Sequence, residues 1–370
     1  MTLQDLPQLI SFCSEDRMSS TSQQEQGNTS TKPLFTKQIV FPQLTSLRLS
    51  SIKTQRIWHS QLSETYCFCL PNLKTIIIEG CHYLQHLLFP SVARNLVHLE
   101  QFEIVNCKCL REIIFTGEIK EEQEDVICFP QLNSLVIKDL QNLLNFCSGN
   151  YNIEFPLLKV LTIKQCPKLK EFISETKMEG KYESSIQALF NEKAAVPSLE
   201  RMTLCHLRNV KKMFHDQLLA GSFGKLEEMI VECCDELLAL FPSNVFGVLQ
   251  SLKTLIVGRC DSLEQMFEVG VAVLNNKETH AVDSQLMKLY IYNLPKLKHV
   301  WNKDPQGSLT FQNLRKVGVR SCESLKNLFP ASIAKDLPQL EYLAISRCGV
   351  EEIVSAGDGL EQPVRFEFPR

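Results

Sequence analysis

The sequence predicts an α/β solenoid, in which a parallel β-sheet lines the concave face of a horseshoe and irregular segments or short helices form the convex side. Two observations support this prediction. A pattern of spaced apolar residues recurs eleven times in one register, and short apolar segments that begin with Phe-Pro recur between some of the copies. The chain has 370 residues, of which 44% are hydrophobic, so it can bury a core along such a stack.

Each copy of the pattern contains a Leu, an apolar residue three positions later and another apolar residue two positions after that. The last two residues alternate with a period of two, which places both side chains on one face of a strand. A single strand cannot cover three aliphatic side chains, each worth about 1.5–3 kcal/mol when fully buried, so the copies must stack. The pattern is that of the leucine-rich repeat, L-x-x-L-x-L-x-x-N/C-x-L. The predicted strand cores are Leu44/Leu47/Leu49, Leu73/Ile76/Ile78, Leu99/Phe102/Ile104, Leu132/Leu135/Ile137, Leu158/Leu161/Ile163, Leu199/Met202/Leu204, Leu226/Met229/Val231, Leu252/Leu255/Val257, Leu286/Leu289/Ile291, Leu314/Val317/Val319 and Leu340/Leu343/Ile345.

Seven of the fifteen cysteines occupy one position of the repeat, three residues after the last apolar residue of the predicted strand core. The chain leaves the strand there, and a small side chain that makes a weak hydrogen bond to the loop backbone fits this place. We expect free thiols, because the N-terminus has no secretory signal. The sequence has no C-x-x-C spacing, so we predict no metal site and no redox site. The seven residues are Cys81, Cys107, Cys166, Cys234, Cys260, Cys322 and Cys348.

The domain organisation follows from where the copies begin. The segment DLPQLISFCS at 5–14 matches DLQNLLNFCS at 139–148, so residues 1–14 are predicted to be the tail of a truncated repeat. Residues 15–40, rich in Ser, Thr and Gln, are predicted to be a flexible polar insert. Residues 41–370 are predicted to be a leucine-rich-repeat solenoid of about eleven repeats that ends in a truncated repeat at Phe368.

Two kinds of segment separate the predicted strands. Pro followed by Ser or Ala and apolar residues predicts short helices within 89–100, 241–253 and 329–341. Longer polar stretches at about 115–128, 174–195, 268–282 and 354–365 are predicted to be mobile inserts at one edge of the array.

Several segments resemble one known family. RIWHSQL (56–62), KMFHDQL (212–218), LPKLKHVWNKDPQGSLTFQNL (294–314) and SLKNLFPASIAKDLPQLEYLAISRCGVEEIV (324–354) resemble the leucine-rich-repeat region of plant disease-resistance proteins. The likeness is to the coiled-coil class of nucleotide-binding leucine-rich-repeat immune receptors. It implies that the region senses a pathogen effector, or a host protein altered by one, and holds a neighbouring nucleotide-binding switch inactive until it does.

The sequence departs from such a full receptor. It contains no G-x-x-x-x-G-K-[ST] phosphate loop, and Gly180-Lys181 and Gly224-Lys225 lack both the upstream glycine and the following hydroxyl. We therefore predict a receptor fragment without the nucleotide-binding domain, and no cofactor. We also predict no enzyme activity, because a catalytic site needs a nucleophile beside a base, or paired acids, in a pocket, and the eight histidines lie at unrelated positions of the repeat.

The charge and hydropathy patterns exclude two classes of partner. A net charge of −3, from 39 basic and 42 acidic residues, lacks the basic excess of a nucleic-acid-binding protein. No apolar run approaches the roughly 20 residues that a membrane-spanning helix needs. With no export signal either, the sequence predicts a cytoplasmic protein.

The predicted binding surface lies on the concave face, where residues between the buried strand positions point outward. The two units that begin at 196 and 223 place Glu200, Glu227, Glu228 and Glu232 there, whereas the last four units are mostly basic and also hold three tyrosines. Arginines and aromatic residues together are typical of protein-binding hot spots. The predicted site residues are Lys253, Arg259, Lys288, Tyr290, Tyr292, Arg315, Lys316, Arg320, Tyr342 and Arg347.

We expect the partner of this surface to be a protein: an effector, a guarded host protein or the switch domain of the receptor itself. Three alternatives remain open at this point. They are an ordinary solvated sheet surface, a scaffold or adaptor whose repeats bind an unrelated protein, and a receptor fragment without a function of its own. An adaptor of the ubiquitin-ligase type normally carries an F-box-like helical segment, which does not precede residue 41.

Overall fold

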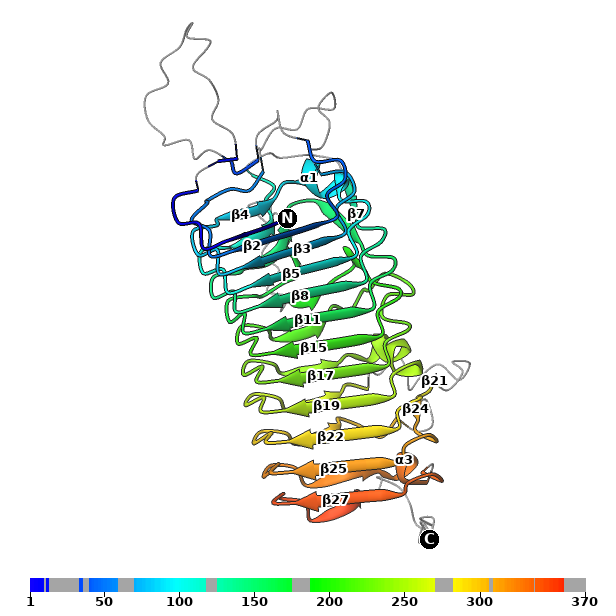
Figure 1. Cartoon of the computed structure of the whole chain (residues 1–370). Coiled ribbons are helices and arrows are strands. Elements are labelled where there is room, and N and C mark those ends of the chain that lie inside the picture. The colour runs from blue at the N-terminus through cyan, green and yellow to red at the C-terminus, as the bar shows by residue number, and fades with distance from the viewer. Residues whose placement is uncertain are drawn as a thin grey trace, which may run out of the picture.

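A computed structural model of the chain describes residues 1–9, 11–12, 33–35, 40–58, 70–117, 125–174, 187–269, 282–305, 309–335 and 337–355. One parallel sheet of twelve strands runs along the whole stack (Figure 1). Neighbours in this sheet follow one another along the chain, with one strand from each repeat. In order they are β1 (Thr2–Gln4), β2 (Ser46–Ser50), β3 (Thr75–Glu79), β5 (Gln101–Val105), β8 (Ser134–Lys138), β11 (Val160–Lys164), β15 (Arg201–Cys205), β17 (Glu228–Glu232), β19 (Thr254–Gly258), β22 (Lys288–Tyr292), β25 (Lys316–Arg320) and β27 (Tyr342–Ser346).

The register of the sheet confirms the predicted strand cores. The second and third residues of each predicted core lie in one strand, and the second residues pair with one another from repeat to repeat; Leu289, for example, pairs with Val317, which pairs with Leu343. These side chains are buried from Leu47 to Val319, whereas Leu343 is only partly buried. The twelfth strand, β1, was not among the eleven predicted cores and pairs with β2.

Every strand of the main sheet is followed by one residue with a positive φ. The angle is +51° to +63° at each of these positions, which are Asp5, Ser51, Gly80, Asn106, Asp139, Gln165, His206, Cys233, Arg259, Asn293, Ser321 and Arg347. The backbone N–H of this residue donates to the carbonyl of the last residue of the next strand, as in His206 to Glu232 at 2.9 Å. Each turn is thus tied to the next repeat, and equivalent turn residues stack along one edge of the sheet.

The predicted short helices are present. They are α1 (Pro90–Asn95), the 3-10 helix η1 (Ser243–Gln250) and α3 (Ala331–Lys335). Figure 1 shows α1 and α3 at the edge where the strands of the main sheet begin. The side behind the main sheet is more regular than predicted, because adjacent repeats also pair there through short parallel strands (Figure 1). These strands are β4 (His86–Leu88), β6 (Glu112–Ile114), β9 (Asn145–Ser148) and β12 (Ile173–Ser174); β13 (Ala188–Phe190), β16 (Lys212–Phe214), β18 (Ala239–Phe241), β20 (Gln265–Phe267) and β23 (His299–Trp301); and β26 (Asn327–Pro330) with β28 (Glu352–Ser355).

Aromatic rings from the short strands form a row through the core. The ring of Phe241 lies 5.8 Å from that of Phe214 and 5.3 Å from that of Phe267, and Phe267 lies 5.5 Å from Trp301. All three pairs are stacked. In these four repeats one aromatic side chain each, in one register, therefore fills the space between the main sheet and the short strands.

Several predicted inserts are partly ordered. Leu34 and Phe35, assigned to the polar insert at 15–40, are buried, and Phe35 stacks on Trp58. The ends of two other inserts form β7 (Asp125–Cys128), β13 and β14 (Ala194–Ala195), because Ile127 and Leu189 are apolar and pack into the core. Strand β7 pairs with β10 (Tyr151–Glu154), and β21 (Val282–Asp283) pairs with β24 (Leu309–Thr310). Most of the other predicted insert residues, and the partial repeat at Phe368, lie outside the described residues.

Candidate functional site

Six of the ten predicted site residues project from the exposed face of three adjacent strands. On β22 the outward residues alternate with Leu289 and Ile291, which are buried. The strand register then places equivalent residues side by side: Lys288 beside Lys316, and Lys316 beside Tyr342. The six residues are Lys288, Tyr290, Tyr292, Lys316, Arg320 and Tyr342.

The other four predicted residues lie at the two ends of the strands. Lys253 and Arg315 immediately precede β19 and β25, whereas Arg259 and Arg347 are the positive-φ residues that follow β19 and β27. All four are exposed. The structure therefore brings the ten residues together on one face and its borders, and we call them the basic-tyrosine surface.

Tyr292 is fixed by contacts with two preceding strands. Its ring lies over Gly258, where a Cβ atom would come within 2.3 Å of the ring carbon Cζ. Its hydroxyl reaches further and donates a hydrogen bond to the Oε1 atom of Glu232 on β17. The guanidinium of Arg259 lies 6.0 Å from the ring centroid, which is within the range of a cation–π contact. Partial burial, together with the hydrogen bond to Glu232 and its charge, raises the pKa of Tyr292 above its ordinary value.

Tyr290 makes a similar contact in the opposite direction along the stack. A Cβ atom at Gly318 on β25 would lie 2.9 Å from Cδ1 of the Tyr290 ring. The two glycines thus provide the space in which the two rings lie flat against the sheet. A ring held in this way loses little additional side-chain freedom when it binds a partner, which favours its use as an anchor.

The ion pairs alter the predicted charge distribution. Lys253 Nζ lies 2.7 Å from Glu227 Oε1, and Arg315 Nη1 lies 3.7 Å from Glu341 Oε1. Glu200, on the acidic side of the sheet, pairs with Lys159 at 3.1 Å. The predicted distribution treated each of these charges as unpaired, because the sequence does not show which residues face each other across strands. The charge difference between the two parts of the face is therefore smaller than predicted.

Five cations of the basic-tyrosine surface keep an uncompensated charge within the described part of the chain. No described carboxylate forms an ion pair with these five residues, which are Arg259, Lys288, Lys316, Arg320 and Arg347. They surround the two tyrosines on consecutive strands. The surface combines fixed aromatic rings with accessible positive charge, which suits a partner that carries exposed acidic groups.

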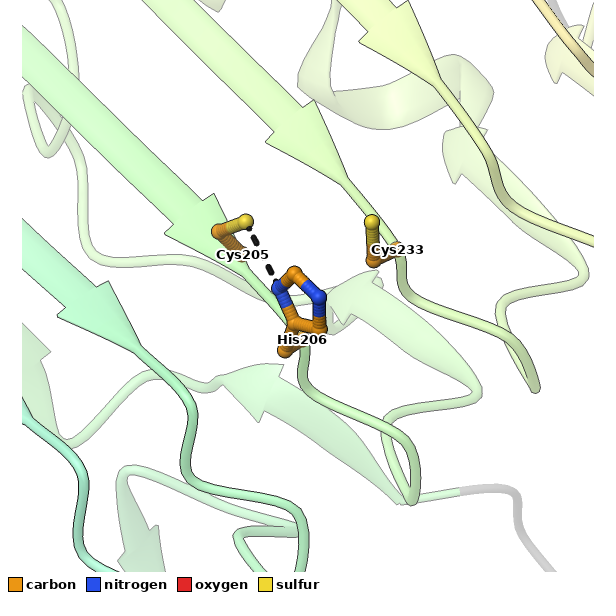
Figure 2. A group of neighbouring side chains, drawn as sticks. All are labelled: Cys205, His206 and Cys233. Atoms are coloured by element: carbon orange, nitrogen blue, oxygen red, sulfur yellow. Dashed lines mark hydrogen bonds between the residues drawn. The ribbon is translucent and has the colours of Figure 1, made fainter.

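Sequence reasoning missed a second group of side chains, shown in Figure 2. Cys205 ends β15, His206 follows it, and Cys233 follows β17, and their ligand atoms all lie within 4.8 Å of one another. The Sγ atom of Cys205 lies 3.0 Å from Nδ1 of His206. The prediction of no metal site was based on linear spacing. The signal that would have found the group is the repeat alignment, which gives His206 and Cys233 the same position in adjacent repeats.

Comparison with known proteins places the repeats in a family. Residues 43–180 and 198–349, which together make up more than half of the chain, match the family described as plant disease resistance protein RPS2-like, leucine-rich repeats. The chain belongs to this family. The strand register and the family match thus agree on a leucine-rich-repeat array, and leucine-rich repeats of this family are typically non-catalytic.

Three curated relatives, all from Arabidopsis thaliana, are similar to parts of this RPS2-like repeat chain. The putative disease resistance protein At4g19050 is 29% identical over 175 residues, which are 46% of this chain and 12% of the relative. The disease resistance protein RPS5 is 28% identical over 109 residues, 30% of this chain and 12% of the relative. The putative disease resistance protein At3g14460 is 24% identical over 345 residues, 83% of this chain and 21% of the relative. The chain therefore spans only a small part of the length of these relatives.

The helices of the described residues are short. None has both the length and the apolar character that a helical membrane span requires.

Proposed function

We propose that the chain is a protein-recognition module of a plant immune receptor and that it binds its partner through the basic-tyrosine surface. The observation that carries the proposal is the pair of fixed rings, Tyr290 and Tyr292, surrounded by cations without acidic partners on consecutive strands. Membership of the RPS2-like repeat family supports a role in disease resistance. We infer that the module acts by binding and has no catalytic activity of its own.

The chemistry of the surface favours an acidic protein partner. Fixed tyrosines supply apolar contact area and a hydroxyl at a small entropic cost, and arginines supply planar donors that match carboxylates. Accessible charges around such a centre mainly accelerate association and select against basic partners. The candidate partners are a pathogen effector, a host protein modified by one, and the nucleotide-binding switch of the receptor.

The overall shape and the location belong to the same proposal. We infer that the exposed face of the main sheet is the concave wall of a horseshoe, which would present several strands to one partner at once. We also infer that the protein works in the cytoplasm. The twelve described cysteines are free thiols, as expected in a reducing compartment.

The test reverses the charge of two unpaired cations. The tagged wild-type chain and the double variant Lys316→Glu with Arg320→Glu are each immobilised and exposed to extracts of infected leaves at low and high salt. We expect the amount of each specifically retained protein to be about tenfold lower, or lower still, for the double variant than for the wild type. The reason is that each charge reversal replaces an attraction with a repulsion. Quantitative mass spectrometry of the retained proteins measures the loss.

The matched control is Lys138→Glu. Lys138 is the last residue of β8 and occupies the same repeat position as Arg320, but it lies several strands away from the basic-tyrosine surface. This variant is expected to retain the same proteins as the wild type. Equal retention by all three chains, or equal loss in Lys138→Glu, would reject the surface as the binding site. Unchanged circular dichroism of each variant checks the fold.

A further inference from the structure

The turns that follow β15 and β17 place two thiols and an imidazole next to each other (Figure 2). The ligand atoms of Cys205, His206 and Cys233 lie within 4.8 Å of one another, and all three residues are partly buried. Four-coordinate zinc with Zn–S bonds of about 2.3 Å and Zn–N bonds of about 2.0–2.1 Å places its ligand atoms somewhat closer together than this limit. Small side-chain rotations are therefore sufficient for the three atoms to share one ion.

The backbone holds the three residues in place before any ion binds. His206 and Cys233 are the positive-φ turn residues of adjacent repeats, with φ angles of 57° and 55°. The N–H of His206 donates to the carbonyl of Glu232 at 2.9 Å, and the N–H of Cys233 donates to that of Gly258 at 3.0 Å. These two bonds belong to the series of hydrogen bonds that joins each turn to the end of the next strand along the main sheet. Metal binding at this place would require little ordering of the chain.

No other pair of consecutive turns has this composition among the described residues. The next turn toward the N-terminus carries Lys164 and Gln165, and the next toward the C-terminus carries Gly258 and Arg259. The cysteines at the repeat position next to the turn, such as Cys234, point into the core and donate to backbone carbonyls instead. Cys205 and Cys233 are the thiols of these two turns that remain partly accessible.

The surrounding charges influence the site in both directions. Lys164, which pairs with Cys205 in the sheet register, and Arg259, next to Cys233, oppose the approach of a cation. They also stabilise thiolates, and Glu232 adds a negative charge nearby. Burial raises the pKa of Cys205 to about 11 and that of Cys233 above its ordinary value. A bound cation would replace both thiol protons, which pass to solvent, and would neutralise the two thiolates.

We propose that Cys205, His206 and Cys233 form a zinc-binding site with a fourth coordination position open to water or to a side chain of a bound protein. Two sulfurs and one nitrogen are a ligand set suited to Zn²⁺ and unsuited to Mg²⁺ or Ca²⁺, which require oxygen ligands. The site lies at the end of β15 and β17, on the border of the same sheet face that holds the basic-tyrosine surface. It is independent of the proposed function, because it requires no protein partner.

The first experiment measures zinc affinity. The purified wild-type chain, kept reduced by a phosphine, is titrated with Zn²⁺ in competition with a chromophoric chelator. We expect one tight equivalent in the wild type. We expect the affinity for this equivalent to fall by about tenfold or more in each of Cys205→Ser, Cys233→Ser and His206→Ala, because the loss of a direct ligand exceeds the effect of an outer-shell change.

The matched control is Cys128→Ser, which removes a partly buried thiol on β7, away from these turns. It is expected to retain the wild-type affinity. The proposal is overturned if the wild type takes no zinc from the chelator, if the three ligand variants keep the wild-type affinity, or if Cys128→Ser weakens binding as much as they do.

A second measurement does not depend on how the variants fold. X-ray absorption of the zinc-loaded wild type is expected to show two sulfur neighbours at about 2.3 Å and at least one nitrogen neighbour at about 2.0–2.1 Å. A shell made only of nitrogen and oxygen would reject the two cysteines as ligands. Four sulfur neighbours would place the zinc elsewhere in the chain.

Discussion

At the scale of single residues, the repeat assigns two opposite roles to cysteine. Cys166 and Cys322 have no exposed surface, and their Sγ atoms donate to the carbonyls of Lys164 and Arg320 at 3.4 and 3.5 Å. The sequence predicted this role from the position of the cysteines in the repeat. Cys205 and Cys233 lie at other positions of the repeat, and their thiols are close to the imidazole of His206 instead. The neighbours of a thiol in the next repeat therefore decide its chemistry.

The buried thiols are expected to resist alkylation in the folded chain. Burial raises the pKa of Cys166 and that of Cys322 to about 12, so almost no thiolate is present at pH 8. The exposed Cys109 serves as an internal control. Iodoacetamide at pH 8 should modify Cys109 rapidly and should modify the two buried thiols only after urea is added, as followed by peptide mass spectrometry. Similar native-state rates at all three cysteines would contradict this role.

Backbone conformation is also decided at this scale. The residue after each main strand has a positive φ, yet glycine occupies only one of these positions, Gly80. The others hold Asp, Ser, Asn, Gln, His, Cys or Arg, and none is β-branched. A β-branched side chain is strongly disfavoured in this region because its Cβ substituents collide with the backbone. The sequence therefore excludes Val, Ile and Thr at the turn without indicating the conformation that requires this.

At the scale of elements, the short strands behind the main sheet depend on their aromatic residues. β16, β18 and β20 each end in a Phe, and the three rings stack on one another. Each of these strands is only three residues long, so its few hydrogen bonds cannot hold it in place alone. The aromatic row supplies the apolar contact area that positions these strands.

Removing one ring from the middle of the row is expected to be strongly destabilising. Phe241→Ala should lower the free energy of unfolding by about 3–5 kcal/mol, because it leaves a cavity between two stacked rings. Urea unfolding followed by circular dichroism measures the change. Tyr83→Ala, at a side chain that is 52% exposed, should stay within about 0.5 kcal/mol of the wild type. A loss below 1 kcal/mol in Phe241→Ala would show that the row is not a main source of stability.

At the scale of the whole molecule, each repeat contacts mainly its two neighbours. The main sheet follows the order of the chain without exception, so an interaction in one repeat reaches distant repeats only through those between them. The stability of such an array is approximately a sum of repeat terms and interface terms. A local defect should therefore have a local effect.

Hydrogen exchange of a core variant tests this locality. Leu161→Ala removes a fully buried side chain from β11, between β8 and β15. We expect amide protection to fall in β8, β11 and β15 and to remain close to that of the wild type in β22 and β25. Exchange measured by mass spectrometry on proteolytic peptides resolves these strands. An equal loss of protection along the whole sheet would mean that the solenoid unfolds as one unit.

The sequence by itself determined the repeat, the eleven predicted strands, the seven cysteines that share one position of the repeat and the family. Strand alternation and repeat spacing are local patterns, so they can be recognised in the order of the residues alone. The tertiary structure alone decided which residues meet across repeats. It placed Glu227 beside Lys253 and Tyr292 over Gly258, and it brought Cys233 to Cys205 and His206. The physical reason is that these contacts join residues 26 or more positions apart, at distances set by the stacking of backbones rather than by spacing along the chain.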